Sequence, residues 1–227
     1  MASIGKSVMK PFLIQASAKH TASFIFLHGL GDNGAGWCEG FNMIKIDYIK
    51  YIFPNAPIRP VTINQNHKMP SWFDVISLDR SAPEDEVGVL ESSDALREII
   101  NEEIKSGIDP TRIIVGGFSQ GGAVASYTAL TSNLKLGGLL LLSTYLPLAA
   151  KFPGALKLDN TTPLFQCHGD SDIVVGLKFG QLSNEKLKTM LVNNQFTIYK
   201  GLGHSTIQKE MEDVDKWIKE TIPLTSI

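Results

Sequence analysis

Short apolar runs of strand length recur along the chain, and most are separated by a segment with the spacing of an amphipathic helix. Glycine, proline or aspartate residues bound these runs, as is typical where strands of a buried sheet end. Six runs are predicted to be strands: Ser23–Leu27, Ile49–Phe53, Arg112–Val115, Leu139–Leu142, Pro163–Cys167 and Phe196–Tyr199. The stretch Asn55–Pro83 has no comparable pattern and is expected to be irregular.

Two helices can be placed by the same reasoning. The first follows Pro83: acidic residues occupy its first turn, and Gly107 is expected to end it. Its apolar positions are Leu96, Ile99, Ile100 and Ile104. The second begins near Ser205, because Gln208 three residues later gives the spacing of a capping box. Its apolar face consists of Ile207, Met211, Val214, Trp217 and Ile218.

The alternation of strands and helices predicts a single α/β domain over residues 1–227, with a mostly parallel central sheet and helices on both faces. We find no internal repeat, low-complexity tract or linker that would divide it. In open parallel sheets, ligands bind beyond the carboxyl ends of the strands. The residues that directly follow each strand are therefore where chemistry is expected.

Composition narrows the classes of function. A net charge of −2 carries no basic excess, so no nucleic-acid partner is expected. The cysteines, Cys38 and Cys167, are too few for a disulfide framework and suit a reducing compartment. The amino-terminal residues lack the apolar run of a signal peptide, and the uncharged stretch Leu136–Ala150 is too short to span a bilayer. We expect a soluble, cytoplasmic protein, whose oligomeric state the sequence does not indicate.

A candidate nucleophile, Ser119, lies in the run Gly117–Gly121, between the strand Arg112–Val115 and a helix-compatible run, Ala123–Leu130. The run matches G-x-S-x-G in the strand–turn–helix context that this motif requires. Glycines are needed on either side because so sharp a turn brings backbone segments into contact. A glycine-rich turn of a nucleotide-binding protein is the alternative, but G-x-G-x-x-G and the P-loop lysine are both missing.

A serine nucleophile needs a base, and the base needs an acid that fixes its tautomer. In this type of fold the acid and then the histidine follow the serine, which leaves His168 and His204. His204 is preferred, because Asp170 and Asp172 then supply an acid from the end of the strand Pro163–Cys167. The residues themselves leave the choice between the two aspartates open. A metal site of His168, Asp170 and Asp172 is not expected, since no further ligand cluster is evident.

Two backbone amides are expected to stabilise the tetrahedral oxyanion. One is that of Gln120, the residue after the nucleophile. The other should come from the loop after Ser23–Leu27, where glycines at 29, 31, 34 and 36 let the backbone curl; Leu30 is the candidate donor.

At these motifs the chain resembles the acyl-protein thioesterase and lysophospholipase family, over roughly residues 20 to 222. The segments that carry the resemblance are 26–32 (FLHGLGD), 69–74 (MPSWFD), 116–122 (GGFSQGG), 166–170 (QCHGD) and 203–205 (GHS). The resemblance implies hydrolysis of long-chain thioesters on S-acylated proteins and of lysophospholipid esters, without a cofactor. It also favours Asp172 over Asp170 as the triad acid, and it supports Leu30 and Gln120 as oxyanion donors.

Two positions depart from the family pattern. Ala2 stands where some animal members carry an acylated cysteine, so that membrane anchor is expected to be absent. Gly176 stands where many members have proline, which is expected to make the loop after the acid more mobile.

An acyl substrate also needs an apolar trough near Ser119. The candidates for its lining are Trp72, Ile76, Leu78, Tyr145, Val174 and Phe179, each of which could equally be core packing. The apolar segment 72–78 is interpreted as a lid or channel wall that contacts membrane surfaces transiently. The alternative function is a carboxylesterase for small soluble esters, with the same triad and a shorter pocket. A catalytically silent binding fold is disfavoured, because every triad member is present.

Overall fold

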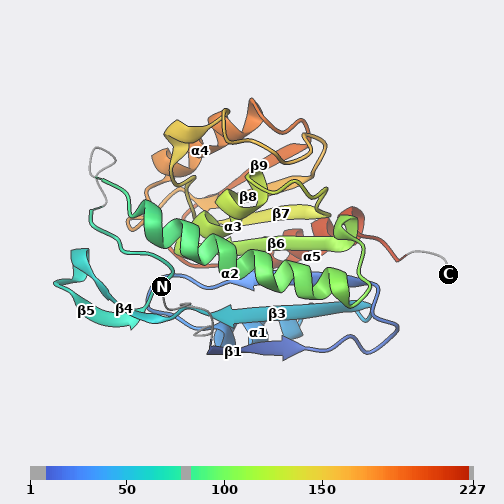
Figure 1. Cartoon of the computed structure of the whole chain (residues 1–227). Coiled ribbons are helices and arrows are strands. Elements are labelled where there is room, and N and C mark those ends of the chain that lie inside the picture. The colour runs from blue at the N-terminus through green and yellow to red at the C-terminus, as the bar shows by residue number, and fades with distance from the viewer. Residues whose placement is uncertain (1–8, 78–82, 225–227) are drawn as a thin grey trace.

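The computed structural model describes residues 9–77 and 83–224, and its centre is a seven-stranded sheet (Figure 1). The strand order is β1-β3-β2-β6-β7-β8-β9. The pair β1–β3 is antiparallel, and the other pairs of this sheet are parallel. The strands are β1 (Met9–Ile14), β2 (Ala22–Leu27), β3 (Ile49–Asn55), β6 (Ile113–Phe118), β7 (Gly138–Leu142), β8 (Leu164–Gly169) and β9 (Asn194–Tyr199).

Helices cover both faces of the sheet, as Figure 1 shows with α2 and α3 in front. The helices are α1 (Gly34–Asn42), α2 (Glu86–Lys105), α3 (Gln120–Leu130), α4 (Leu177–Lys188) and α5 (Gln208–Thr221). Buried side chains of α2, α3 and α4 pack into one core, which is rich in aliphatic residues. Those of α1 and α5 pack into a second core, where aromatic rings pack against one another. In the second core, for example, the ring centroids of Phe24 and Phe41 are 4.9 Å apart.

The predicted fold class, an α/β domain with a mostly parallel sheet between helices, is confirmed. All six predicted strands are present, with bounds within three residues of the expected ones. The helix predicted after Pro83 is α2, and the left-handed backbone of Gly107, with φ 101°, follows its end. Leu96 and Ile100 are its deeply buried apolar residues.

The prediction for Asn55–Pro83 was incomplete, because a small antiparallel hairpin forms there. Its strands are β4 (Ile58–Val61) and β5 (His67–Pro70), which make a sheet of their own. Each strand contains a proline, Pro60 in β4 and Pro70 at the end of β5, which hides the pattern, since a proline is tolerated only where no ladder hydrogen bond is needed. The same property concealed β1, an edge strand that contains Pro11.

The start of α5 was also predicted wrongly. The helix begins at Gln208 with Ile207 as its N-cap, and no side chain caps it. The side-chain NH₂ of Gln208 donates instead to the Glu212 carboxylate, one turn further along, at 2.8 Å. Ser205 thus lies in the loop before the helix and not in a capping box.

Parallel pairing brings the carboxyl ends of β2, β6, β7, β8 and β9 to the same edge of the sheet. The loops that leave these ends carry Leu30 after β2, Ser119 after β6, Asp172 after β8 and His204 after β9. The topology therefore gathers residues that are far apart in the sequence.

Candidate active site

Ser119 lies between β6 and α3 with φ 52° and ψ −121°, a conformation that residues other than glycine rarely adopt. The neighbouring glycines make this turn possible. A Cβ atom on Gly117 would lie 2.4 Å from the Gly121 carbonyl carbon, and one on Gly121 would lie 2.3 Å from the Leu27 carbonyl oxygen. The Thr144 hydroxyl donates to the Ser119 carbonyl at 2.6 Å and holds the turn. The serine thus stands at the amino end of α3, where helix amides favour negative charge.

Asp172 and His204 are joined by a hydrogen bond of 2.7 Å between Oδ2 and Nδ1. The other carboxylate oxygen accepts the amides of Val174 and Val175 at 2.9 and 2.8 Å. The Asp172 side chain is fully buried, so water cannot solvate it. These three hydrogen bonds compensate the carboxylate for the loss of its hydration. With its Nδ1 proton donated to Asp172, the neutral imidazole of His204 has Nε2 available as a proton acceptor.

Two packing contacts place neighbouring loops beside Ser119. The ring of His204 packs on that of Phe118, with centroids 4.7 Å apart. A Cβ atom on Gly29 would lie 3.2 Å from Phe118 Cδ1 and 3.4 Å from Ser119 Cβ. The base and the loop that carries Leu30 therefore both lie close to the turn of the residue that the motif predicts to be the nucleophile.

Asp170 has a different role in the loop after β8. Its Oδ1 atom accepts the Gly201 amide at 2.6 Å and thereby ties this loop to the one that carries His204. Of the two aspartates, Asp172 is the one that contacts the imidazole. Among the described residues, no group of three or more His, Cys, Asp and Glu side chains is arranged to hold a metal ion.

His168 supports the loop of Asp172 from inside. It is completely buried, and its Nε2–H donates to the Val175 carbonyl at 2.7 Å. Burial lowers the pKa of His168, so the ring is neutral and its 3.6 Å approach to Asp172 is not an ion pair. The ring fits because residue 180 is glycine: a Cβ atom there would lie 2.4 Å from His168 Nδ1.

The two expected oxyanion donors follow different strands, Leu30 after β2 and Gln120 after β6. Gln120 is the first residue of α3, where a helix amide has no intrahelical acceptor. Leu30 follows His28, whose Nδ1–H donates to the Gly29 carbonyl at 2.7 Å while Nε2 accepts the Ala56 amide at 3.0 Å. Burial lowers the pKa of His28, so this neutral tautomer fixes the backbone just before Leu30.

An apolar cavity of about 250 Å³ opens near these residues. It is lined by four of the predicted trough residues: Ile76, Tyr145, Val174 and Phe179. Further apolar lining residues that were not predicted include Leu146, Ala149, Ala150 and Val175. Their positions in the segments that follow β7 and Asp172 were the signal that could have identified them. Among the lining residues, Val174 is two residues after Asp172 in the sequence. Tyr145 directly follows Thr144, whose hydroxyl donates to the Ser119 carbonyl.

Two predicted trough residues need separate comment. Trp72 does not line the cavity; it is 3% exposed and belongs to the core on the α2 face. Its indole N–H donates to the His28 carbonyl, and this bond directs the ring into the protein. Leu78 lies outside the described residues. Within the described part of the chain, none of the helices is long and apolar enough to cross a bilayer.

Nearly the full chain matches known proteins. A model of the family described as phospholipase/carboxylesterase matches residues 9–222. Acyl-protein thioesterase 1 of Neurospora crassa is 41% identical over 94% of this chain and 92% of its own length. Acyl-protein thioesterase 1 homolog 1 of Dictyostelium discoideum is 44% identical over 96% and 99%. The crystal structure of Zea mays acyl-protein thioesterase 2 matches with a TM-score of 0.87 and 32% identity, over 94% of this chain and 99% of that one.

Proposed function

Because the chain belongs to the phospholipase/carboxylesterase family of α/β-hydrolases, we propose that it hydrolyses long-chain acyl thioesters on S-acylated proteins. The observation that carries this proposal is the buried bond between Asp172 and His204, placed next to the strained Ser119 and an apolar cavity. The relatives named as acyl-protein thioesterases support the choice of a thioester over other carboxylic esters.

Catalysis proceeds through an acyl-enzyme on Ser119. The Ser119 oxygen attacks the thioester carbonyl carbon while His204 Nε2 takes the hydroxyl proton, and Asp172 stabilises the imidazolium. The amides of Leu30 and Gln120 donate to the oxyanion; one such donor is worth ~3 kcal/mol of barrier in comparable enzymes. The C–S bond then breaks, and the departing thiolate takes the proton from His204. A water molecule, deprotonated by His204, attacks the acyl-serine; His204 then returns that proton to the departing Ser119 oxygen, which releases the fatty acid and restores the free hydroxyl.

The acyl chain occupies the cavity between the 73–77 segment and the residues that follow β7 and Asp172. Each buried CH₂ group contributes ~0.8 kcal/mol, so a long chain is favoured over a short one. The same groups act on the oxygen ester of a lysophospholipid, which presents the same carbonyl and a similar chain. We include this second substrate in the proposal.

Substrates of this kind reside in bilayers, and apolar side chains are exposed beside the cavity. Ile76 and Val174, which line it, are 38% and 46% exposed, and Ile173 is 93% exposed. We place the contact with the membrane at these residues and expect it to be transient. A cytoplasmic location is part of the same proposal, supported by the two unpaired cysteines, Cys38 and Cys167.

The proposal is tested with purified protein and an S-palmitoylated peptide, by measuring release of the free thiol. A series of thioesters from acetyl to hexadecanoyl tests the cavity, and Ser119→Ala serves as the inactive control. We expect kcat/KM to rise with chain length. A maximum at two to four carbons, with no release from the palmitoylated peptide, would instead identify a carboxylesterase for small esters.

A further inference from the structure

Trp72 makes hydrogen bonds to both segments that hold the proposed oxyanion donors. Its backbone N–H donates to the side-chain oxygen of Gln120 at 2.9 Å. Its indole N–H donates to the His28 carbonyl at 2.8 Å, two residues before Leu30. The side chain is 3% exposed, so bulk water does not compete for these bonds.

The residues on either side of Trp72 repeat this connection. The Gly31 amide, directly after Leu30, donates to the Pro70 carbonyl at 2.8 Å. The side-chain NH₂ of Gln120 donates to the Phe73 carbonyl at 2.6 Å. The residue after Leu30 and the side chain of Gln120 are therefore both bonded to one short segment, residues 70–73.

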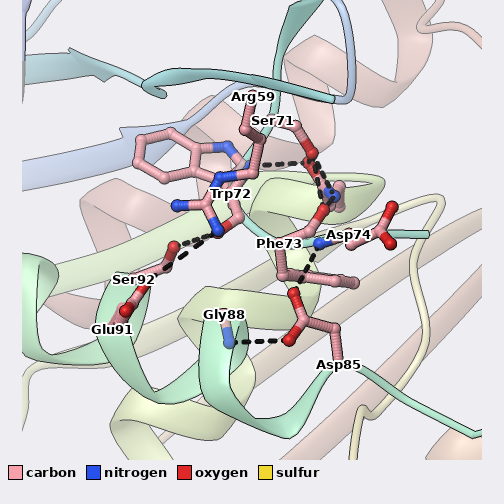
Figure 2. Close-up of polar contacts among 10 residues, drawn as sticks. Arg59, Ser71, Trp72, Phe73, Asp74, Asp85, Gly88, Glu91 and Ser92 are labelled. Carbon is pink, nitrogen blue, oxygen red and sulfur yellow. Dashed lines mark hydrogen bonds and ion pairs between the residues drawn. The ribbon is translucent and has the colours of Figure 1, made fainter. Parts of the chain in front are cut away.

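This segment is itself held by α2, as Figure 2 shows. The Ser92 hydroxyl donates to the Trp72 carbonyl. Asp85 accepts the Asp74 amide at 2.7 Å and the Gly88 amide at 3.0 Å, so one carboxylate caps α2 and fixes the segment. A Cβ atom at position 88 would lie 2.2 Å from that carboxylate, which explains the glycine. Residues 71–74 are thus a fixed wall and not the mobile part of a lid.

We propose that Trp72 is a positioning residue that sets the separation between the Leu30 and Gln120 amides. The inference rests on the proposed function, because it takes these two amides to be the oxyanion donors. Both donors must lie about 2.7–3.1 Å from the oxyanion, and a displacement of ~1 Å can cost about 100-fold in rate. Packing accounts for the burial of the Trp72 ring, but the two polar bonds to the two donor loops are what a positioning role requires.

The test compares Trp72→Phe with Trp217→Phe. Phenylalanine at 72 keeps an aromatic ring in the core but cannot donate to the His28 carbonyl. Trp217 is a buried tryptophan of α5 on the opposite face of the sheet, so its replacement controls for lost ring volume. We expect Trp72→Phe to lower kcat by about 10- to 100-fold, with KM within about threefold of wild type. Trp217→Phe should lower the melting temperature and leave kcat unchanged.

An alkyl trifluoromethyl ketone gives a second readout, because its adduct with Ser119 carries an oxyanion in the same position. Its Ki should rise in Trp72→Phe by the factor by which kcat/KM falls. Unchanged kcat, or a lower kcat with unchanged Ki, overturns the proposal. If Trp72→Phe does not fold, Ser92→Ala removes the donor to the Trp72 carbonyl with less disturbance. This substitution should lower kcat and raise the Ki of the ketone by similar factors. If both kcat and Ki are unchanged, the proposal is also overturned.

All these rates are measured on p-nitrophenyl butyrate as well as on an acyl thioester. A wild-type protein that hydrolyses only the butyrate ester contradicts the proposed function. The comparison of Trp72 variants can still be made on that ester, because every acyl transfer through Ser119 forms an oxyanion.

Discussion

Replacement of Asp172 by asparagine is an informative perturbation, because the surroundings of the carboxylate determine how the new amide points. Oδ1 accepts the amides of Val174 and Val175 at 2.9 and 2.8 Å, so asparagine keeps its carbonyl oxygen there. Its NH₂ group then faces His204 Nδ1, which lies 2.7 Å from Oδ2 in the wild type. Two donors cannot share that contact, so the imidazole carries its proton on Nε2 instead. In this tautomer His204 cannot accept the proton of Ser119.

A tautomer change of this kind costs about 10⁴-fold in kcat in a comparable triad, or ~5 kcal/mol of barrier. The effect on folding is smaller, ~1–2 kcal/mol, because both backbone amides keep an acceptor that has only lost its charge. Turnover of a saturating thioester and thermal melting measure the two effects separately. The matched control is Asp170→Asn, which alters the bond to the Gly201 amide and should leave kcat within about threefold. If Asp172→Asn retains more than about a hundredth of wild-type kcat, or if Asp170→Asn is the more damaged variant, the reasoning fails.

Three further outcomes are expected. Ser119→Ala should reduce thioester and ester hydrolysis to background while the protein stays folded, and it should resist labelling by a fluorophosphonate; substantial residual turnover would contradict the mechanism. Ala149→Leu fills part of the cavity, so kcat/KM for a hexadecanoyl thioester should fall relative to an octanoyl one; an unchanged ratio would place the chain elsewhere. Burial raises the pKa of Glu210 from 4.5 to about 7 in the folded state, so the contribution of this residue to stability is fully present below pH 4.5, and about 3 kcal/mol of it is lost as pH rises to 7. Glu210→Gln should therefore melt well above wild type at pH 8 and near it at pH 4, and equal melting temperatures at both pH values would refute this.

The sequence predicted the elements whose signals are local. The strand before Ser119 and the helix after it follow from an apolar run, glycines and a helix-compatible run, and the structure has them there. The choice between Asp170 and Asp172 was beyond that reasoning, because it depends on the path of the loop. The amides at 174 and 175 turn one carboxylate toward His204, and the Gly201 amide holds the other.

Other features escaped prediction because their causes lie far away in the sequence. Helix α1 contains three glycines, which disfavour a helix, yet Gly34 is required because a Cβ atom there would lie 2.5 Å from the Phe53 carbonyl oxygen. Trp72 has the composition of a trough residue, and its actual place is decided by acceptors on Gln120 and His28. The apolar character of Trp72 indicates that its side chain is buried. The acceptor that its indole N–H needs determines where in the protein it is buried.

The strand order also determines when the protein can become active as it folds. The reacting groups follow β6, β8 and β9, and a proposed donor follows β2, so parallel pairings across most of the sheet must form before they meet. Each parallel pairing joins two strands that a long crossover connection separates. The conformational entropy of that connection is lost before the contacts between the strands are gained. During refolding, helices can form from local segments and restore the helical ellipticity, whereas hydrolysis requires β9 to pair with β8. Recovered turnover after dilution from denaturant therefore reports the last stage of folding, and it should lag behind the circular dichroism signal.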